Sequence, residues 1–572
     1  SSNLEVLMQA RPLEGATRRR MMFSPRTLVL AAVLAVALAA PAPTPAAVCG
    51  DFTGDETINA TDALMVLKTA VGLETCEVCV CDVNGSDKVD ATDALFVLKQ
   101  AVQLEVSLSC TDCGALECPA GYQANSAGSA CEDIDECAQG TDDCDAATTC
   151  LNSDGGFDCA IDCTAEAFED ALGACGYGNG TIKFNCSDTV IQLPHEADWS
   201  ARKVSCDDMV IDGLDNNITF ELNPACYDVG GDDCPSLSDG TGFLVLRGDR
   251  NVVRNLTIRN FFEGIRTKGA DNTVQSVTLE RQCGDSLSNE EEGTGNLFKD
   301  LTVSDGCKRC ARVFGDASAI TSPNPRDDAH YNAVFEGVAF DNCKQPLLAS
   351  DGGRFLIKDS SMSASAGAAY GCDGPKFSGA DTTVIHMRGT TVDNCRNGVW
   401  VAGSAEALLV GNTISNCSRR GLLAKGSARV SLSWNTIRDN GGASSSTLGF
   451  GGVAVAETAT ADLGGGSLSI DGQTLSSPGA NLLCDNLNAS DQPQDVHNLT
   501  DPEVAVSAQN NWWCDGDASD QVAGDVDFSS ELQAQAVCGD SVLIAGVEDC
   551  DDGNTATTDA CLDFCTVAAC GD

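Results

Sequence analysis

Oxygen-bearing side chains recur at fixed positions in two twelve-residue segments near the start of the chain. The first segment reads DFTGDETINATD (residues 51–62) and the second reads DVNGSDKVDATD (residues 82–93), which starts 31 residues later. Side-chain oxygens stand at positions 1, 3, 5, 9 and 12, and a backbone carbonyl would serve at position 7. A hard cation needs about six to eight oxygens around one point, so both segments predict Ca²⁺ sites. The predicted ligands are Asp51, Thr53, Asp55, Thr57, Asn59 and Asp62 in the first segment, and Asp82, Asn84, Ser86, Lys88, Asp90 and Asp93 in the second.

An apolar helical segment follows each loop, ALMVLKTAVGL after the first and ALFVLKQAVQL after the second. The duplicated loop–helix pattern, with no helix leading into the loop, resembles dockerin domains over residues 48–106. The resemblance implies that Ca²⁺ is required for folding and that the helices dock onto a cohesin-like partner protein. Ser86 stands where the family usually has Asp, so we expect the second loop to bind Ca²⁺ more weakly. The alternative is a calcium-stabilised spacer without a partner.

Cysteines are dense in residues 110–163, which contain CPAGYQANSAGSAC, DIDEC and CLNSDGGFDC. This pattern resembles an EGF-like segment whose second module is of the calcium-binding kind. The resemblance implies that Asp133, Glu136 and Asn152 hold Ca²⁺. Cys163 comes later than the family spacing, which leaves the last disulfide open. The alternative is a disulfide knot that binds no metal.

Composition limits the compartment and the partners. The chain carries 84 acidic and 34 basic side chains, a formal net charge of −50, which excludes nucleic acid as an expected partner. Its 32 cysteines lack paired zinc spacing, and there are only 4 histidines, so an oxidising compartment fits best. Arginines, an apolar run and APAPTPAA within residues 1–47 predict a signal peptide preceded by an overcalled start. We expect an extracellular or cell-surface protein with no transmembrane segment in the mature chain.

An internal repeat occupies residues 164–537, where a short β segment, a turn with Asn or Gly and another β segment recur. One coil alone cannot bury its inward side chains, but stacked coils pair in parallel and share a core. The pattern therefore predicts an all-β, right-handed parallel β-helix, with residues 164–176 as a sealing helix. Cys395 and Cys417 would be neighbours, as a disulfide or as thiols, and the alternative fold is a β-propeller or sandwich. The equivalent apolar positions are Ile258, Leu279, Val303, Phe340, Met362, Val392, Ile414 and Ile437, spaced by 21, 24, 37, 22, 30, 22 and 23 residues.

The segments GIRTKGADNTVQSVTLERQCGDSLSN and VSDGCKRCARV resemble the pectin-lyase-like fold and, within it, family 3 pectate lyases. The resemblance implies β-elimination on a polyuronate, with Ca²⁺ bound by acidic residues and a lysine assisting. Asp285 matches one acidic ligand and Lys308 matches the lysine. Gly284 and Lys268 stand where the other two acidic ligands should be, so whether the protein is an enzyme stays open.

Basic side chains are concentrated in residues 247–312, either as a groove for an anionic glycan or as solvated faces that balance nearby acids. The best functional hypothesis is recognition of an extracellular polysaccharide, polyuronates included, with cleavage by β-elimination as the enzyme version. The alternative is a non-catalytic adhesive or scaffold protein that docks through the dockerin-like domain. Residues 538–572 resemble the cysteine-rich repeats of secreted myxobacterial-type proteins and are expected to be a truncated unit.

Overall fold

The computed structural model divides into two compact units, residues 1–132 and 133–572. Residues 1–47, which contain the predicted signal peptide, and most of the predicted C-terminal repeat lie outside the described residues. No helix among the described residues is long and apolar enough to cross a membrane. The structure describes residues 48–55, 57–110, 118–125, 130–176, 180–194, 202–226, 242–290, 292–316, 330–364, 373–379, 382–442, 451–514, 517–538, 540, 543–545, 547–548, 550–551 and 561.

The first unit contains the helices α1 (Ala60–Ala70), α2 (Val78–Cys81) and α3 (Ala91–Ala101) and the short strand β1 (Tyr122–Ala124). The side chains of Asn59 and Asp90 cap α1 and α3, each within a reciprocal capping box. A small core contains two buried side chains of α1 and two of α3, together with Cys81 and Val83. The disulfides Cys49–Cys110 and Cys76–Cys81 also hold this domain together. Such cross-links stabilise small domains, because a small domain buries little apolar surface.

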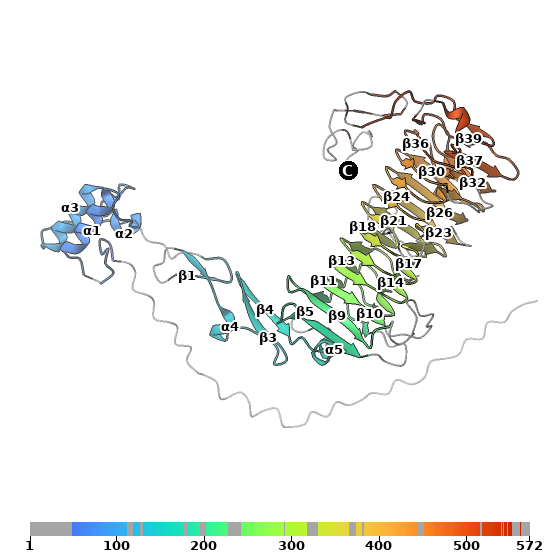
Figure 1. The fold of residues 1–572 in the computed structure, drawn as a ribbon. Coiled ribbons are helices and arrows are strands. Elements are labelled where there is room, and N and C mark those ends of the chain that lie inside the picture. The colour runs from blue at the N-terminus through green and yellow to red at the C-terminus, as the bar shows by residue number, and fades with distance from the viewer. Residues whose placement is uncertain are drawn as a thin grey trace, which may run out of the picture. The chain divides into compact units, whose positions relative to one another are not determined.

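The second unit is a parallel β-helix, which confirms the predicted fold class (Figure 1). One wall is a twelve-stranded parallel sheet, called here the long sheet. Its strands in order are β7 (Arg202–Val204), β10 (Gly242–Leu246), β12 (Glu263–Thr267), β14 (Asp285–Asn289), β17 (Arg309–Phe314), β20 (Leu347–Ser350), β23 (Lys376–Gly379), β26 (Asn397–Gly403), β29 (Arg420–Ala424), β32 (Gly451–Glu457), β37 (Val496–Thr500) and β39 (Val522–Ala523).

The strands of the other walls stack in the same way. They are β5 (Thr181–Phe184), β6 (Val190–Pro194), β8 (Val210–Asp212), β9 (Ile218–Asn223), β11 (Val252–Arg259), β13 (Thr273–Glu280), β15 (Asn296–Lys299), β16 (Thr302–Ser304), β18 (Ala333–Glu336), β19 (Ala339–Asp341), β21 (Arg354–Lys358), β22 (Ser361–Ser363), β24 (Val384–Arg388), β25 (Thr391–Asp393), β27 (Glu406–Val410), β28 (Thr413–Ser415), β30 (Arg429–Ser433), β31 (Thr436–Arg438), β33 (Thr460–Asp462), β36 (Leu482–Cys484), β38 (Val506–Ser507) and β40 (Val526–Asp527). A hairpin of β34 (Leu468–Ile470) and β35 (Gln473–Leu475) and a short 3-10 helix (Ala518–Asp520) complete the unit.

The eight apolar positions predicted to be equivalent lie one above another. Each is the register partner of the next on parallel strands, from Ile258 opposite Leu279 through to Ile414 opposite Ile437. All eight are buried in one continuous core. Burial of a full aliphatic side chain stabilises by about 1.5–3 kcal/mol, so this column holds the coils together. The insertions predicted within the 37- and 30-residue coils fall largely on residues 317–329 and 365–372, outside the described residues.

Asparagine does more at the turns than the sequence predicted. The expected left-handed backbone occurs at residues such as Asn394 and Asn416, whose φ angles are 53° and 54°. A different set forms a buried ladder, because Asn412 donates its backbone and side-chain N–H groups to Asn435 Oδ1, 2.9 and 3.0 Å away. Asn435 donates to Asn481 in the same way. The ladder therefore satisfies turn amides that the parallel strands leave unpaired.

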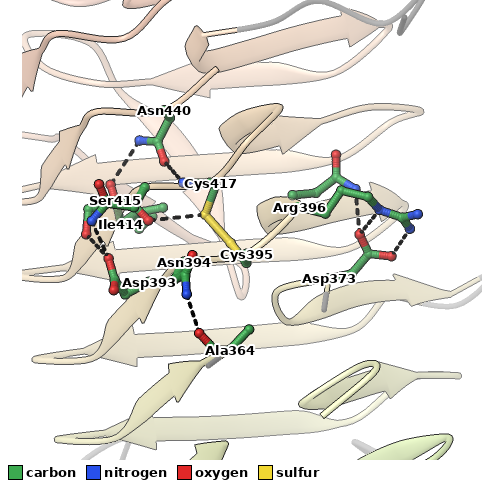
Figure 2. The surroundings of a disulfide bond; sticks show 12 residues. Ala364, Asp373, Asp393, Asn394, Cys395, Arg396, Ile414, Ser415, Cys417 and Asn440 are labelled. Atoms are coloured by element: carbon green, nitrogen blue, oxygen red, sulfur yellow. Dashed lines mark hydrogen bonds and ion pairs between the residues drawn. A yellow bond between two sulfur atoms is a disulfide. The ribbon is translucent and has the colours of Figure 1, made fainter. Parts of the chain in front are cut away.

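Cys395 and Cys417 are bridged, so the thiol alternative is wrong (Figure 2). The bridge joins two successive coils just after β25 and β28. Beside it, the Cys417 backbone amide donates to Asn440 Oδ1 at 3.0 Å, and Asn440 Nδ2 donates to the Ile414 carbonyl at 3.0 Å (Figure 2). Disulfide and asparagine side chain together fix this corner of the solenoid.

The N-terminal end of the β-helix is sealed by α5 (Ala165–Gly173), as predicted. The Thr164 side chain caps the helix, and the Phe168 ring lies 4.5 Å from the ring of Phe220, centroid to centroid. The apolar face of the helix therefore covers the open end of the core, which solenoids must protect.

The EGF-like module is continuous with this end. It contains β2 (Cys131–Asp133), α4 (Glu136–Gln139) and an antiparallel hairpin of β3 (Thr149–Ser153) and β4 (Gly156–Ile161). The last strand pairs in parallel with β5, with Ile161 opposite Phe184. Cys163, whose partner the sequence left open, bonds to Cys186 in the first coils. The module thus supplies an extra rung to the solenoid.

Candidate functional site

A cavity of ≈ 310 Å³ opens on the long sheet over the strands β17, β20, β23 and β26. Its lining is charged and aromatic. The lining residues are Lys308, Arg309, Lys344, Gln345, Asp373, Gly374, Lys376, Asn397, Gly398 and Trp400. A concave site with one aromatic side chain and several convergent polar groups is the usual form of a small-molecule or glycan subsite.

Strand register places Trp400 in this cavity. Lys376 and Trp400 are direct partners on β23 and β26, while their neighbours Phe377 and Val399 are buried in the core. Successive strand residues point to opposite faces, so Lys376 and Trp400 project outward side by side. The Lys376 Nζ lies 4.9 Å from the indole centroid, and Lys425 Nζ lies 5.6 Å from it. These contacts orient the indole beside two cations.

The cavity has a net positive charge. Among the residues that the structure describes, no carboxylate pairs with Lys308, Lys344 or Lys376. Asp373, the one carboxylate of the lining, accepts from Arg396 Nε at 2.9 Å and from Asn397 Nδ2 at 2.6 Å, both on Oδ1, and Arg396 also holds Oδ2 (Figure 2). Its charge is therefore neutralised within the wall.

Arg420 adds a further cation beside the cavity, because it is the register partner of Asn397 on the next strand. Burial lowers the pKa of Arg420 to about 10, with Arg419 adding to this effect and Asp373 opposing it. The guanidinium stays charged at neutral pH. The chain as a whole is strongly acidic, so this positive patch is a local property of the long sheet.

The two predicted catalytic residues differ in exposure and in their partners. Lys308 is exposed and lines the cavity. Asp285 lies one coil away, its side chain 6% exposed, and is held by Arg309 through Nε–Oδ1 and Nη2–Oδ2 contacts of 2.7 and 3.1 Å. Arg312 Nη1 lies 3.9 Å from the same carboxylate. The guanidinium of Arg309 therefore occupies the carboxylate oxygens of Asp285 that Ca²⁺ would use. The role of Asp285 in catalysis stays a prediction.

Most of the basic run at residues 247–312 is committed to ion pairs. Arg254 pairs with Asp212, and Lys299 pairs with Glu336. Lys268, which stands where the resemblance expects an acid, pairs with Glu290. These basic residues therefore balance local acids, whereas Lys308, near the end of the same run, lines the cavity.

The sequence analysis predicted no role for three residues of the cavity, Lys344, Lys376 and Trp400. Lys308 and Lys344 occupy the same place in the repeats DGCKRCARV and DNCKQPLLA, and aligning the repeats would have shown a lysine column. Trp400 carried no such signal, because only the pairing of β23 with β26 brings it to the lysines.

The first predicted calcium loop has the geometry of a cation cradle. Asp62 is fully buried, and its Oδ1 accepts from the Thr53 amide and hydroxyl, both at 2.9 Å. Asp51 Oδ1 accepts from the Gly54 amide at 2.8 Å, and Asp55 Oδ1 accepts from the Thr57 amide at 3.0 Å. The Thr53 hydroxyl also lies 3.3 Å from Asp51 Oδ1, so the carboxylates of Asp51 and Asp62 lie on the same side of the loop, which fits a hard divalent cation.

The second loop repeats this arrangement. Asp82 and Asp93 are fully buried, and Asp93 Oδ1 accepts from the Val83 amide at 3.0 Å. Burial raises the pKa of Asp93, and the charges of Asp82 and Asp90 add to the rise. A bound cation would relieve this crowding. Ser86, at position 5, donates its hydroxyl to the Lys88 carbonyl at 3.0 Å, so both predicted ligands lie together in the loop.

The EGF-like ligands also converge. Asn152 Nδ2 donates to Asp133 Oδ2 at 2.7 Å, and the Gly155 amide donates to Asp133 Oδ1 at 2.6 Å. Glu136 Oε2 is buried and has no hydrogen-bond partner in the described part of the chain. A buried carboxylate oxygen without a hydrogen-bond partner, in a residue that the resemblance gives as a ligand, fits Ca²⁺ in this module.

Family comparisons agree with this modular reading. The dockerin type I domain model matches residues 49–102, the calcium-binding EGF domain model matches residues 133–186, and the right handed beta helix region model matches residues 376–474. The chain is thus a modular protein with these three kinds of domain, of which the first two imply calcium binding. The resemblances to family 3 pectate lyases and to myxobacterial-type repeats stay predictions.

Individual relatives are similar over limited parts. Fibulin-7 of Mus musculus is 50% identical over 42 residues, which are 7% of this chain and 10% of that protein. An alginate lyase from Paenibacillus sp. is 14% identical, with 48% of this chain and 94% of that chain covered and a TM-score of 0.36. The A-module of the mannuronan C-5 epimerase AlgE4 from Azotobacter vinelandii is 9% identical, with 62% and 83% covered and a TM-score of 0.29.

Proposed function

We propose that this protein is exported and that its β-helix recognises an extracellular polysaccharide in the cavity on the long sheet. The observation that carries the proposal is the partly exposed Trp400 in an open, polar-rimmed cavity on a rigid sheet. Indole rings offer a large flat surface at small entropic cost, and sugar rings present C–H faces that pack on it. The many disulfides fit an oxidising, extracellular setting, while the signal peptide stays a prediction.

Binding of the full chain to a panel of soluble polysaccharides tests the proposal. We expect Trp400→Ala to weaken binding at least tenfold, because aromatic stacking is lost. Trp512→Ala is the matched control, since Trp512 is also partly exposed but does not line the cavity. Equal loss in both variants, or none in Trp400→Ala, would remove the cavity as the binding site.

Cleavage by β-elimination is the enzyme version of the proposal. Lys308 would act as the base that removes the C5 proton next to the uronate carboxylate, the C4–O4 bond would break, and the leaving oxygen would take up a proton from water. Asp285 would act through Ca²⁺, which is the alternative to direct binding of the carboxylate by lysines. The exposed position of Lys308 in the cavity supports the first role. Absorbance of an unsaturated product from polygalacturonate with Ca²⁺, lost in Lys308→Ala and Asp285→Ala, would establish the lyase. Binding without product would leave a receptor.

A second function, docking through the dockerin domain, is favoured by a specific observation. α1 and α3 expose the same apolar positions, Leu64 and Leu95, which are 52% and 48% exposed. The C-cap residues of the two helices, Val71 and Val102, are exposed as well and lie about two turns further on. Clustered exposed aliphatic side chains mark protein interfaces. We expect a cohesin-like protein to bind the full chain and EDTA to abolish binding. Leu64→Asp with Leu95→Asp should do the same without loss of bound Ca²⁺.

A further inference from the structure

The cavity also carries an inference about the class of glycan, which rests on the proposed function. We infer that the site selects acidic polysaccharides and that it binds their carboxylates or sulfates directly with lysines, without a bridging Ca²⁺.

The first argument is the contrast between the lysines of the cavity and the other cations of the long sheet. Arg309 is matched by Asp285, and Arg396 by Asp373. Lys308, Lys344 and Lys376 have no such acid among the described residues, although acids outnumber bases by more than two to one in the chain. An acidic protein that leaves three neighbouring lysines unmatched in a cavity has a complementary site for anions.

The second argument is the absence of a carboxylate cradle in the described lining. Ca²⁺ requires several oxygen ligands, with anionic ones prominent among them. Asp373 is the single lining carboxylate, and Arg396 and Asn397 already engage it. The calcium loops of this protein have the opposite character, because Asp62, Asp82 and Asp93 are buried carboxylates. The cavity wall therefore lacks the oxygen ligands that a calcium bridge to a glycan would need, whereas the loops supply them.

The third argument is the placement of the cations around the indole. Lys376 and Lys425 flank the Trp400 ring, and Lys308 and Lys344 precede β17 and β20, which are adjacent strands about 4.8 Å apart. A sugar ring on the indole would hold its acidic group toward these lysines. Lys308 and Lys344 hold equivalent positions on successive coils, and Lys376 lies on the coil after them, level with Leu348. Cations on three successive coils suit a polymer that bears one anionic group per unit.

The test measures binding of the full chain to polygalacturonate and to its carboxyl-reduced, neutral counterpart, with and without EDTA and across NaCl concentrations. We expect strong preference for the acidic polymer, affinity that falls as salt rises, and binding that survives EDTA. The variant Lys308→Gln/Lys344→Gln/Lys376→Gln should lose about tenfold or more in affinity, as expected for a few exposed ion pairs. Arg388→Gln/Arg438→Gln is the control, because it removes exposed charge outside the cavity.

The outcomes separate this inference from the proposed function. Equal binding of both polymers, reduced by Trp400→Ala, would leave polysaccharide recognition standing and overturn the selection of acids. Binding that requires Ca²⁺ and is unchanged in the triple lysine variant would overturn direct recognition by lysines. No binding of any polymer would overturn both. Circular dichroism of each sample with EDTA checks that the β-sheet signal of the solenoid is retained.

Discussion

The asparagine ladder makes a quantitative prediction for Asn435→Ala. Asn435 is buried at a turn between β30 and β31, and its Oδ1 accepts two N–H groups of Asn412. Its Nδ2 donates to the Leu409 carbonyl at 2.9 Å and to Asn481 Oδ1 at 3.0 Å. The same Nδ2 lies 3.0 Å from the Ser433 carbonyl, so alanine removes five side-chain hydrogen bonds at once.

The magnitude follows from the groups left without partners. The Asn412 backbone amide loses its side-chain acceptor, and the Leu409 carbonyl loses a donor. A buried polar group without a partner costs about 1–3 kcal/mol, so two of them reduce the free energy of unfolding of the β-helix by about 2–6 kcal/mol. Gln492→Ala serves as control, because Gln492 is exposed and its side chain bonds only within its own loop.

Denaturant unfolding of the full chain, followed by the β-sheet signal in circular dichroism, measures the difference. The transition of the solenoid is compared at constant Ca²⁺, so that the other domains do not contribute to the change. A loss in Asn435→Ala within about 0.5 kcal/mol of that in Gln492→Ala would show that the ladder contributes no more than a surface residue.

Three further predictions concern one histidine and two predicted calcium ligands. Burial lowers the pKa of His386 from 6.5 to about 4, so the unfolded chain alone takes up a proton as pH falls below 6.5. Stability should therefore drop by about 3 kcal/mol between pH 6.5 and 4, and His386→Gln should remove that part of the drop in a pH series of denaturant melts. Asp133→Ala should abolish Ca²⁺ binding in the EGF-like module and speed amide hydrogen exchange in β5 (Thr181–Phe184), since β4 pairs with it. Asp62→Ala should remove one Ca²⁺ per chain, measured by calorimetric titration, and prevent α1 from folding.

Each of these has a result that would contradict it. An unchanged pH dependence in His386→Gln would place the titration elsewhere. Protection of β5 that is independent of Ca²⁺ would show that the module is only tethered to the solenoid. Full calcium stoichiometry in Asp62→Ala would mean that the first loop is not a site.

The solenoid could be predicted from the sequence because each coil repeats one inward apolar position. Ile414 and its seven counterparts had to stack if any parallel β-helix formed, and the register confirms all of them. The helix within residues 164–176 was predictable as well, because a solenoid needs an apolar face to cover the open end of its core.

The site could be predicted only in part, because lateral pairing between coils decides which side chains meet. Lys308 was found by resemblance, but its neighbours Lys376 and Trp400 lie on strands about 70 and 90 residues further along the chain, and no local pattern marks them. Asp285 was assigned to Ca²⁺, whereas the next coil places Arg309 on it. Ion pairs between coils depend on which residues of neighbouring strands are register partners. The spacing of the apolar residues gives this register only once the strands of successive coils have been aligned.

A crystal structure of the full chain with a short acidic oligosaccharide tests the central claim most directly. A sugar ring stacked on Trp400, with its acidic group within ion-pair distance of Lys308, Lys344 or Lys376 and no metal between them, is the predicted result. An oligosaccharide bound through Ca²⁺ at Asp285, or on another wall of the β-helix with the cavity empty, would contradict it.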